Sequence, residues 1–301
     1  MSPQHELSGY AQNYWTFDPN LYANYTFVAL FGCTMAMHTL QGIHHRRKDS
    51  WIIITSALWQ FSAYIARGLS IHFPSNQWLF LAWNSLMMVR STIHPQITTN
   101  CCYQTAPLWT NAFIYVLVGH LICQSPCFSR RAETKVRGWH ISAGFVMLDI
   151  VAFAIQATGI ILAILPQSVQ TMNQGLYIYL AGISSQQLFI LFFSFLLWKS
   201  LQSQESKEEQ VVSTGPLWPI FAALALISVR IIFRLIEYSG GINSSISRQE
   251  AYAYAFDSVP MLLALWLFNV YHPGRTGVTI LYNMKLAGSN VSSNALYCQQ
   301  F

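Results

Sequence analysis

The stretch LWPIFAALALISVRIIFRLIEY, residues 217–238, decides the fold of this chain. It is about as long as the roughly 20 residues that an α-helix needs to cross about 30 Å of hydrocarbon. Its charged residues are Arg230, Arg234 and Glu237, at positions i, i+4 and i+7, so they share one stripe of a helix. The stretch therefore predicts a transmembrane helix whose charged stripe faces protein or water and not lipid.

Apolar segments of similar length occupy most of the rest of the chain. The predicted spans are residues 22–43, 51–71, 78–122 with an interruption, 139–165, 175–198, 217–238 and 251–271. The composition agrees, since 53% of residues are hydrophobic and 9% are charged, against roughly 25% charged in a soluble domain. We therefore predict an all-α polytopic membrane protein with seven transmembrane helices in one membrane domain, residues 22–272.

The distribution of lysine and arginine predicts the orientation in the membrane. These residues gather after the first, third and fifth predicted spans and in the tail. Because short cytoplasmic loops carry the excess of basic residues, residues 1–21 are predicted to be extracellular and residues 273–301 to form a cytosolic tail. Residues 1–21 show no cleavable signal peptide. We expect a multi-pass protein of the plasma membrane, and sequons on the outer side predict glycosylation of Asn24 and Asn243.

Residues 89–104 interrupt the third predicted span. They place Arg90, His94, Pro95 and several threonines between two apolar halves that would otherwise join into one long helix. One interpretation is a retained intron, because valine codons begin with GT and glutamine is encoded by CAG, which match the two ends of such a segment. The other is a genuine outer loop between a re-entrant half-helix and the third span. Sequencing of transcripts across these codons decides between them.

Charged and amide side chains inside the predicted spans form the candidate site. Such groups are costly at membrane depth, so they usually face the bundle interior and find a partner there. The candidates are Arg67, Asp149, Gln156, Arg230, Arg234, Glu237, Glu250 and Asp257. Asp257 is the natural partner for an arginine of the sixth span, and Pro260 should weaken the helix one turn after it.

The charges inside the spans balance formally. Arg67, Arg230 and Arg234 stand against Asp149, Glu237 and Asp257. These groups could merely fix how the helices pack, or they could line a site for the polar head of an amphiphile. Asp149 and Asp257 could instead carry protons, because a carboxyl group that has lost its water binds a proton more readily. The sequence leaves these alternatives open.

The motifs of other function classes are missing from the sequence. The six cysteines give no metal-binding or disulfide framework, and there is no histidine box, activated serine or nucleotide-binding loop. We therefore expect no catalytic residues, no cofactor and no metal. The net charge of +5 follows the topology of the loops and does not indicate nucleic acid. The expected partners are membrane lipids or an amphiphilic small molecule.

Several segments resemble the fungal RTA-like family of lipid-translocating exporters. The most specific is residues 230–275, in which Arg230, Arg234 and Glu237 are followed by Glu250, Tyr254, Phe256-Asp257, Pro260-Met261, Asn269 and His272-Pro273-Gly274-Arg275. Residues 24–41, 106–115 and 149–159 are also similar to the family, so the resemblance covers about residues 20–275. Gln60, Ala63, His120 and the 89–104 insert depart from its usual pattern.

The resemblance implies a seven-helix membrane protein related to sphingoid-base exporters, aminocholesterol-resistance proteins and a porphyrin transporter. Its expected function is the translocation or export of lipids or other amphiphiles, with resistance to a toxic lipid or secondary metabolite as one outcome. The alternative is a seven-helix receptor or lipid-stress sensor, which the helix count and the outer N-terminus also fit. In that case the polar stripes would form a ligand-triggered switch.

Overall fold

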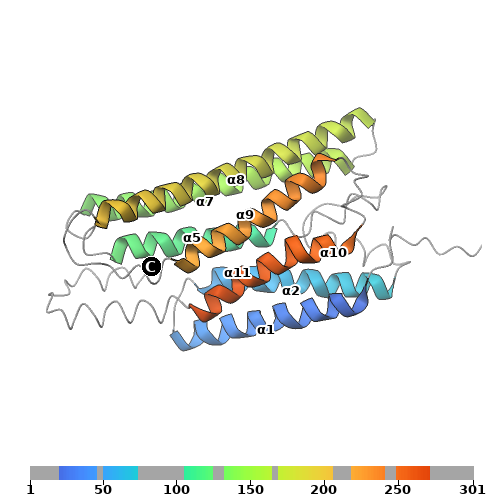
Figure 1. The fold of residues 1–301 in the computed structure, drawn as a ribbon, viewed down its shortest axis with the longest axis horizontal. Coiled ribbons are helices and arrows are strands. Elements are labelled where there is room, and N and C mark those ends of the chain that lie inside the picture. The colour runs from blue at the N-terminus through green and yellow to red at the C-terminus, as the bar shows by residue number, and fades with distance from the viewer. Residues whose placement is uncertain are drawn as a thin grey trace, which may run out of the picture.

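In the computed structural model, the described residues are 20–45, 50–73, 105–124, 132–164, 169–205, 218–240 and 249–271. They form seven helical rods that lie side by side, and no strand occurs among them (Figure 1). The rods are α1 Leu21–His45, α2 Ser50–His72, α5 Thr105–Gln124, α7 Ala132–Ile164, α8 Val169–Glu205 and α9 Trp218–Ser239, followed by the last rod, which joins α10 Glu250–Ala253, the π-helix η2 Tyr254–Ser258 and α11 Val259–Val270.

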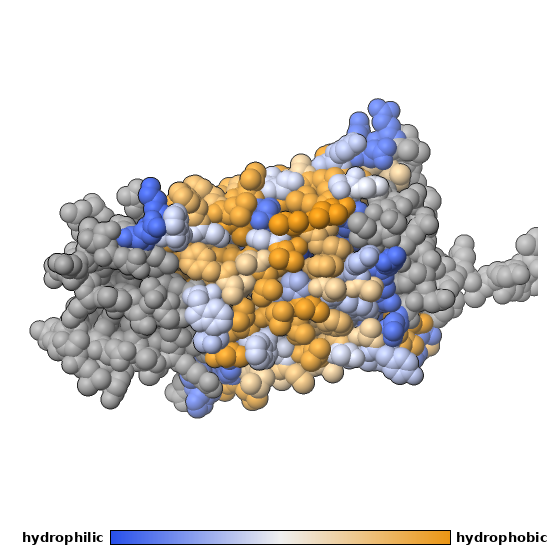
Figure 2. Space-filling view, in the orientation of Figure 1, coloured by the Kyte–Doolittle hydropathy of each residue, from blue (hydrophilic) through white to orange (hydrophobic). Residues whose placement is uncertain are grey.

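The surface of the bundle is that of a membrane protein. Large apolar side chains such as Leu188 and Phe192 are 65% and 55% exposed, whereas Arg230 and Arg234 are each 1% exposed. An apolar band crosses the middle of the bundle, and hydrophilic residues lie toward its ends (Figure 2). Charged residues inside and apolar residues outside suit a surrounding of lipid, so the chain is an all-α, multi-pass membrane protein.

Five of the rods contain a helix long and apolar enough to cross a membrane. These helices are Leu21–His45, His140–Ala163, Gln170–Lys199, Trp218–Ser239 and Glu250–Val270. In α5 the shorter segment Pro107–Gly119 is apolar. The remaining rod, α2, has 23 residues and packs against α1 and α5. The number of rods agrees with the seven predicted spans, of which the third is represented by its second half.

The ends of α8 correct the predicted fifth span. The predicted span covers residues 175–198, but the helix runs from Val169 to Glu205. Its 37 residues correspond to roughly 55 Å at about 1.5 Å per residue, which exceeds the about 30 Å of the hydrocarbon core. The 89–104 insert, the cytosolic tail at 273–301 and Asn243 lie outside the described residues.

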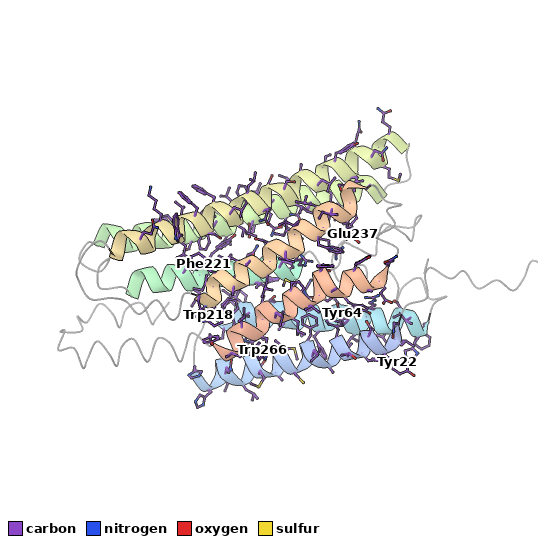
Figure 3. All side chains as sticks on the ribbon, viewed as in Figure 1. Tyr22, Tyr64, Trp218, Phe221, Glu237 and Trp266 are labelled. Carbon is purple, nitrogen blue, oxygen red and sulfur yellow. The ribbon has the colours of Figure 1, made fainter. Side chains whose placement is uncertain are left out.

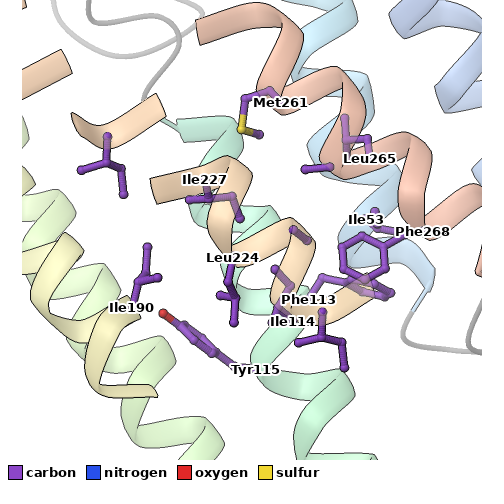
Figure 4. Close-up of a cluster of buried hydrophobic side chains, with 14 of the residues drawn as sticks. Ile53, Phe113, Ile114, Tyr115, Ile190, Leu224, Ile227, Met261, Leu265 and Phe268 are labelled. Atoms are coloured by element: carbon purple, nitrogen blue, oxygen red, sulfur yellow. The ribbon is translucent and has the colours of Figure 1, made fainter. Parts of the chain in front are cut away.

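A cluster of apolar side chains at the centre of the bundle holds the rods together (Figure 4). Its members include Ile53 of α2, Phe113 and Ile114 of α5, Leu224 and Ile227 of α9, and Met261, Leu265 and Phe268 of α11. The rings of Phe113 and Phe268 meet edge to face at 5.2 Å. This packing fixes α9 against α11 and so sets the position of the charged residues one or two turns further along both helices.

Glycine residues bring α7 and α8 into backbone contact. A Cβ atom on Gly159 would overlap the backbone nitrogen of Tyr179, and one on Gly175 would overlap that of Ala163. A Cβ atom on Gly182 would lie 2.9 Å from the backbone nitrogen of Gln156. Small residues at such seams let membrane helices approach closely, so these three glycines define how α7 and α8 pair.

Asn24 corrects one predicted modification. It is 0% exposed, and its amide nitrogen donates a hydrogen bond to the carbonyl oxygen of Tyr64 at 3.1 Å. Gly68 packs beside it, since a Cβ atom there would come within 2.9 Å of the same nitrogen. A glycan needs an exposed acceptor nitrogen, so the predicted glycosylation of Asn24 is not compatible with this packing.

Candidate functional site

The Asp257 cluster joins α9 to the last rod and consists of Arg230, Arg234, Glu237 and Asp257. Oδ1 of Asp257 forms an ion pair with Nε of Arg230, and Oδ2 forms one with Nη2 of Arg234. Nη1 of Arg234 also donates to Oε2 of Glu237 at 2.9 Å. All four residues are at most 3% exposed. The predicted pairing of Asp257 with an arginine of the sixth span is therefore confirmed, and two arginines take part.

A turn of π-helix presents Asp257 to these arginines. In η2 the N–H of Val259 donates to the carbonyl oxygen of Tyr254, five residues earlier. Pro260 follows directly and has no N–H to continue the ordinary α-helical pattern. The wide turn leaves Asp257 and the adjacent Ser258 both buried, whereas Phe256 is exposed. Single π-helical turns within α-helices are frequent at functional sites, which supports this segment as part of one.

The Glu250 cluster lies one to two turns nearer the end of the bundle and consists of Arg67, Glu250, Tyr254 and the backbone amide of Asn20. Oε1 of Glu250 pairs with Nη2 of Arg67 and accepts a hydrogen bond from the Tyr254 hydroxyl at 2.9 Å. Oε2 accepts a hydrogen bond from the Asn20 amide at 2.9 Å. The guanidinium carbon of Arg67 lies 5.0 Å from the Tyr254 ring centroid. The cluster ties α2 to the last rod and to the start of α1.

Stacked aromatic rings connect the two clusters. Phe27 of α1 stacks on Tyr64 at 5.4 Å and on Tyr254 at 5.0 Å. Phe31, one turn further along α1, also stacks on Tyr64 at 5.4 Å. The Tyr64 hydroxyl is hydrogen-bonded to Oγ of Ser258, the residue after Asp257. Tyr64 and Glu237 lie on separate rods toward the same end of the bundle (Figure 3).

Asp149 and Gln156 lie apart from both clusters. Oδ2 of Asp149 accepts a hydrogen bond from Nδ2 of Asn111 on α5 at 2.9 Å. The Tyr115 hydroxyl, one turn further along α5, faces the same carboxyl group. Gln156 donates to Oε1 of Gln186 on α8 at 3.0 Å. The structure thus brings together six of the eight predicted site residues and places the other two in the contacts of α7 with α5 and α8.

The ion pairs use a different set of carboxylates from the formal charge tally of the predicted spans. Arg67, Arg230 and Arg234 pair with Glu250, Asp257 and Glu237, whereas the sequence tally counted Asp149 in place of Glu250. Glu250 was left out of that tally because it lies at the edge of the last apolar run, where hydropathy does not reveal that it turns inward. With Glu250 included, the two clusters are neutral without Asp149.

Sequence reasoning missed several buried polar residues. Asn111 and Tyr115 stand at i and i+4 of α5, a spacing that could have indicated a polar stripe. His38 is not among the predicted site residues, yet it is 1% exposed and its Nε2 lies 3.1 Å from the carbonyl oxygen of Leu265. Gln41 donates to the carbonyl oxygen of Asn269 at 2.8 Å. These bonds hold α1 against α11, and a single histidine in an apolar run gave no signal for them.

Replacing Arg67 with lysine tests the Glu250 cluster. We expect Arg67→Lys to lower the stability of the protein by about 1–2 kcal/mol, because lysine lacks the planar guanidinium that both stacks on Tyr254 and bonds Glu250. Thermal unfolding of the purified variant in detergent measures this loss. Tyr254→Phe is the matched control, since it keeps the ring and removes only the hydroxyl bond to Glu250. Equal stability of Arg67→Lys and the wild type would show that the stacked guanidinium contributes nothing.

Comparison with known proteins identifies the family of this chain. The family model described as "RTA1 like protein" matches residues 53–278. "Probable lipid transporter atnI" of Emericella nidulans is 32% identical over 279 residues, which cover 87% of this chain and 68% of that protein. "Protoporphyrin uptake protein 1" of Saccharomyces cerevisiae is 26% identical over 224 residues, covering 72% of this chain and 66% of that one.

A shorter match concerns "Lipid-translocating exporter-like protein RTA1" of Leptosphaeria maculans, which is 35% identical over 71 residues, or 19% of this chain and 14% of that protein. No solved structure matches the chain. The family model covers most of the bundle and includes every residue of the two clusters except Asn20. The resemblance predicted from residues 230–275 is thereby confirmed, and the chain belongs to the RTA1-like family of membrane proteins.

Proposed function

We propose that this protein translocates lipids or other amphiphiles across the membrane and that the Asp257 and Glu250 clusters contact their polar heads. The observation that carries the proposal is the set of three arginines and three carboxylates inside a bundle with an apolar surface. A molecule with a charged head and an apolar tail matches both the buried charged residues and the apolar surface. The names of the relatives, a probable lipid transporter and a lipid-translocating exporter, support this class of substrate.

The ion pairs between rods give the proposal a mechanism. Arg230 and Arg234 belong to α9, whereas Asp257 belongs to the last rod. A buried ion pair contributes little more stability than an apolar contact of equal volume. A cationic head can therefore take the place of an arginine, and an anionic head the place of a carboxylate, without leaving a buried charge alone. Such an exchange of partners separates α9 from the last rod and opens the bundle beside the bound head.

The proposal also covers the setting of the protein. We place residues 1–21 outside the cell, the tail at 273–301 in the cytosol and the two clusters toward the outer leaflet of the plasma membrane. The chain acts as a transporter and not as an enzyme, with lipids or amphiphilic small molecules as its partners. Uphill movement then requires an ion gradient or a partner protein.

Flux of labelled amphiphiles tests the proposed function. Cells or vesicles that contain the protein are loaded with a labelled sphingoid base or a labelled phospholipid, and efflux is followed for the wild type and for Asp257→Asn. Asparagine keeps the shape and one acceptor oxygen but loses the charge that holds two arginines. We expect efflux to fall at least about tenfold, which corresponds to about 1.4 kcal/mol in the rate-limiting barrier.

Two controls make this result interpretable. The amount of folded variant is measured by fluorescence-detected size exclusion, so that a loss of protein is not mistaken for a loss of transport. Glu237→Gln is the milder matched variant, because its amide oxygen can still accept the 2.9 Å bond from Arg234. Equal efflux by folded Asp257→Asn and wild type would refute the role of the cluster, and no efflux of either probe by the wild type would refute the proposed function for these classes.

A further inference from the structure

Asp149 differs from the other carboxyl groups of the bundle. Among the side chains that the structure describes, Glu237, Glu250 and Asp257 each form an ion pair with an arginine. The polar neighbours of Asp149 are instead an amide, Asn111, and a phenol, Tyr115. Asp149 is 1% exposed and lies near the middle of α7. An ionised carboxylate in this position would be a buried charge without a countercharge, which is strongly unfavourable at membrane depth.

The atoms around Asp149 have too few hydrogens for their oxygens. Oδ1 of Asp149 and Oδ1 of Asn111 are buried acceptors that no donor among the described residues reaches in ordinary hydrogen-bond geometry, and the single hydrogen of the facing Tyr115 hydroxyl can serve only one of them. An ionised aspartate can only accept hydrogen bonds, whereas a protonated one also donates. A proton on Asp149 therefore removes the charge and adds the donor that this group of oxygens lacks.

Among the side chains that the structure describes on the helices around Asp149, none brings a countercharge to it. On α5 the facing groups are Asn111 and the titratable Tyr115, whose hydroxyl lies near Ile190 of α8 (Figure 4). The pairs Gln156 with Gln186 and Phe145 with Phe193 fix the register of α7 on α8. That register places residues 189–193 of α8 opposite Asp149, and none of them is charged.

A proton suits this site better than a metal ion does. Hard cations bind about six or more oxygen ligands, whereas Asp149, Asn111 and Tyr115 together supply fewer. No group of three or more His, Cys, Asp or Glu side chains suited to a metal occurs among the described residues. A proton needs only the carboxyl oxygen to which it is bound and one acceptor for its hydrogen bond.

We propose that Asp149 is a proton-binding site that couples proton movement to transport, whereas Asp257 pairs with two arginines. This proposal rests on the proposed transport function. In the arrangement described here Asp149 is a neutral acid. When α5 and α7 part and admit water, its O–H bond breaks and the proton leaves to that water. The carboxylate takes up a proton again from the other side of the membrane before the helices close, so each cycle moves one proton.

Infrared spectroscopy tests the proton site without any need for transport. The purified protein in lipid nanodiscs at neutral pH should show the C=O stretching band of a protonated carboxyl group, which an ionised carboxylate does not have. We expect Asp149→Asn to remove this band and Asp257→Asn to leave it in place. Asparagine resembles a protonated aspartate, so Asp149→Asn should also unfold at the temperature of the wild type. Absence of the band in the wild type, or its persistence in Asp149→Asn, would overturn the proposal.

Flux measurements in proteoliposomes test the coupling. With a pH gradient across the membrane, the wild type should accumulate a labelled sphingoid base against its concentration gradient, and Asp149→Asn should not. Without a pH gradient, downhill exchange by Asp149→Asn should stay within about twofold of the wild type, because the two clusters are intact. Uphill accumulation by Asp149→Asn, or a loss of its downhill exchange, would each refute coupling at Asp149. A wild type that moves no probe refutes the proposed function instead, and the infrared band then decides the proton site alone.

Discussion

Replacement of Asp257 with leucine should destabilise the protein by about 3–5 kcal/mol, the cost of removing one partner from a buried ion pair. Asp257 is 1% exposed and holds both Arg230 and Arg234. Without it, Arg234 keeps its bond to Glu237, but Arg230 loses the carboxylate that balances its charge. The measurement is the thermal or denaturant midpoint of the purified protein in detergent or nanodiscs.

A second variant separates stability from transport in this experiment. Arg230→Met combined with Asp257→Leu removes one positive and one negative charge and leaves the pair of Arg234 with Glu237. We expect this double variant to recover most of the lost stability, because apolar residues of similar volume can replace a buried pair. Efflux of the labelled amphiphile by the double variant should stay as low as efflux by Asp257→Leu, because both lack the carboxylate at position 257. A single variant as stable as the wild type would contradict the ion pairs described here.

Replacement of Gly159 with leucine should prevent α7 and α8 from pairing. Even a Cβ atom at this position would overlap the backbone nitrogen of Tyr179, and a backbone atom cannot turn aside as a side chain can. Overpacking at ordinary core positions costs about 1–3 kcal/mol, and we expect the loss here to reach or exceed the upper end of that range. The yield of monodisperse protein and its thermal midpoint report the effect.

Gly144 offers a matched control on the same helix. A Cβ atom added there meets nothing within 4 Å. Gly144→Leu should therefore leave the midpoint unchanged or raise it slightly, because glycine is a poor helix former by about 1 kcal/mol. Similar midpoints for the two leucine variants would show that the close approach of α7 and α8 does not matter for stability.

The fold could be predicted from sequence because hydropathy and helix length are properties of each segment alone. The run at residues 217–238 became α9 within a residue at each end. The ends of α8 were missed because a helix that extends beyond the hydrocarbon carries polar residues, which resemble a loop when hydropathy is the signal. Hydropathy also could not show that Asn24 is buried, since its burial depends on Tyr64 and Gly68, which lie more than 35 residues away.

Sequence predicted those parts of the candidate site that depend on the spacing of residues along one helix. It missed the parts that depend on contacts between helices. The stripe of Arg230, Arg234 and Glu237 and its pairing with Asp257 followed from helical periodicity and charge. Sequence could not predict that Glu250, and not Asp149, balances the charge of Arg67, because this pairing depends on how α2 lies against α10. The amide and hydroxyl neighbours of Asp149 likewise come from a different helix.

The close contact of α7 and α8 at Gly159, Gly175 and Gly182 limits how the helices of the bundle can move. Helices in backbone contact cannot slide past each other without steric overlap, so α7 and α8 move as one rigid body. The opposite side of the bundle is held by bonds that can exchange, such as those of His38 and Gln41 to carbonyl oxygens of α11. An opening of the bundle such as the proposed separation of α9 from the last rod would therefore leave the α7–α8 pair intact.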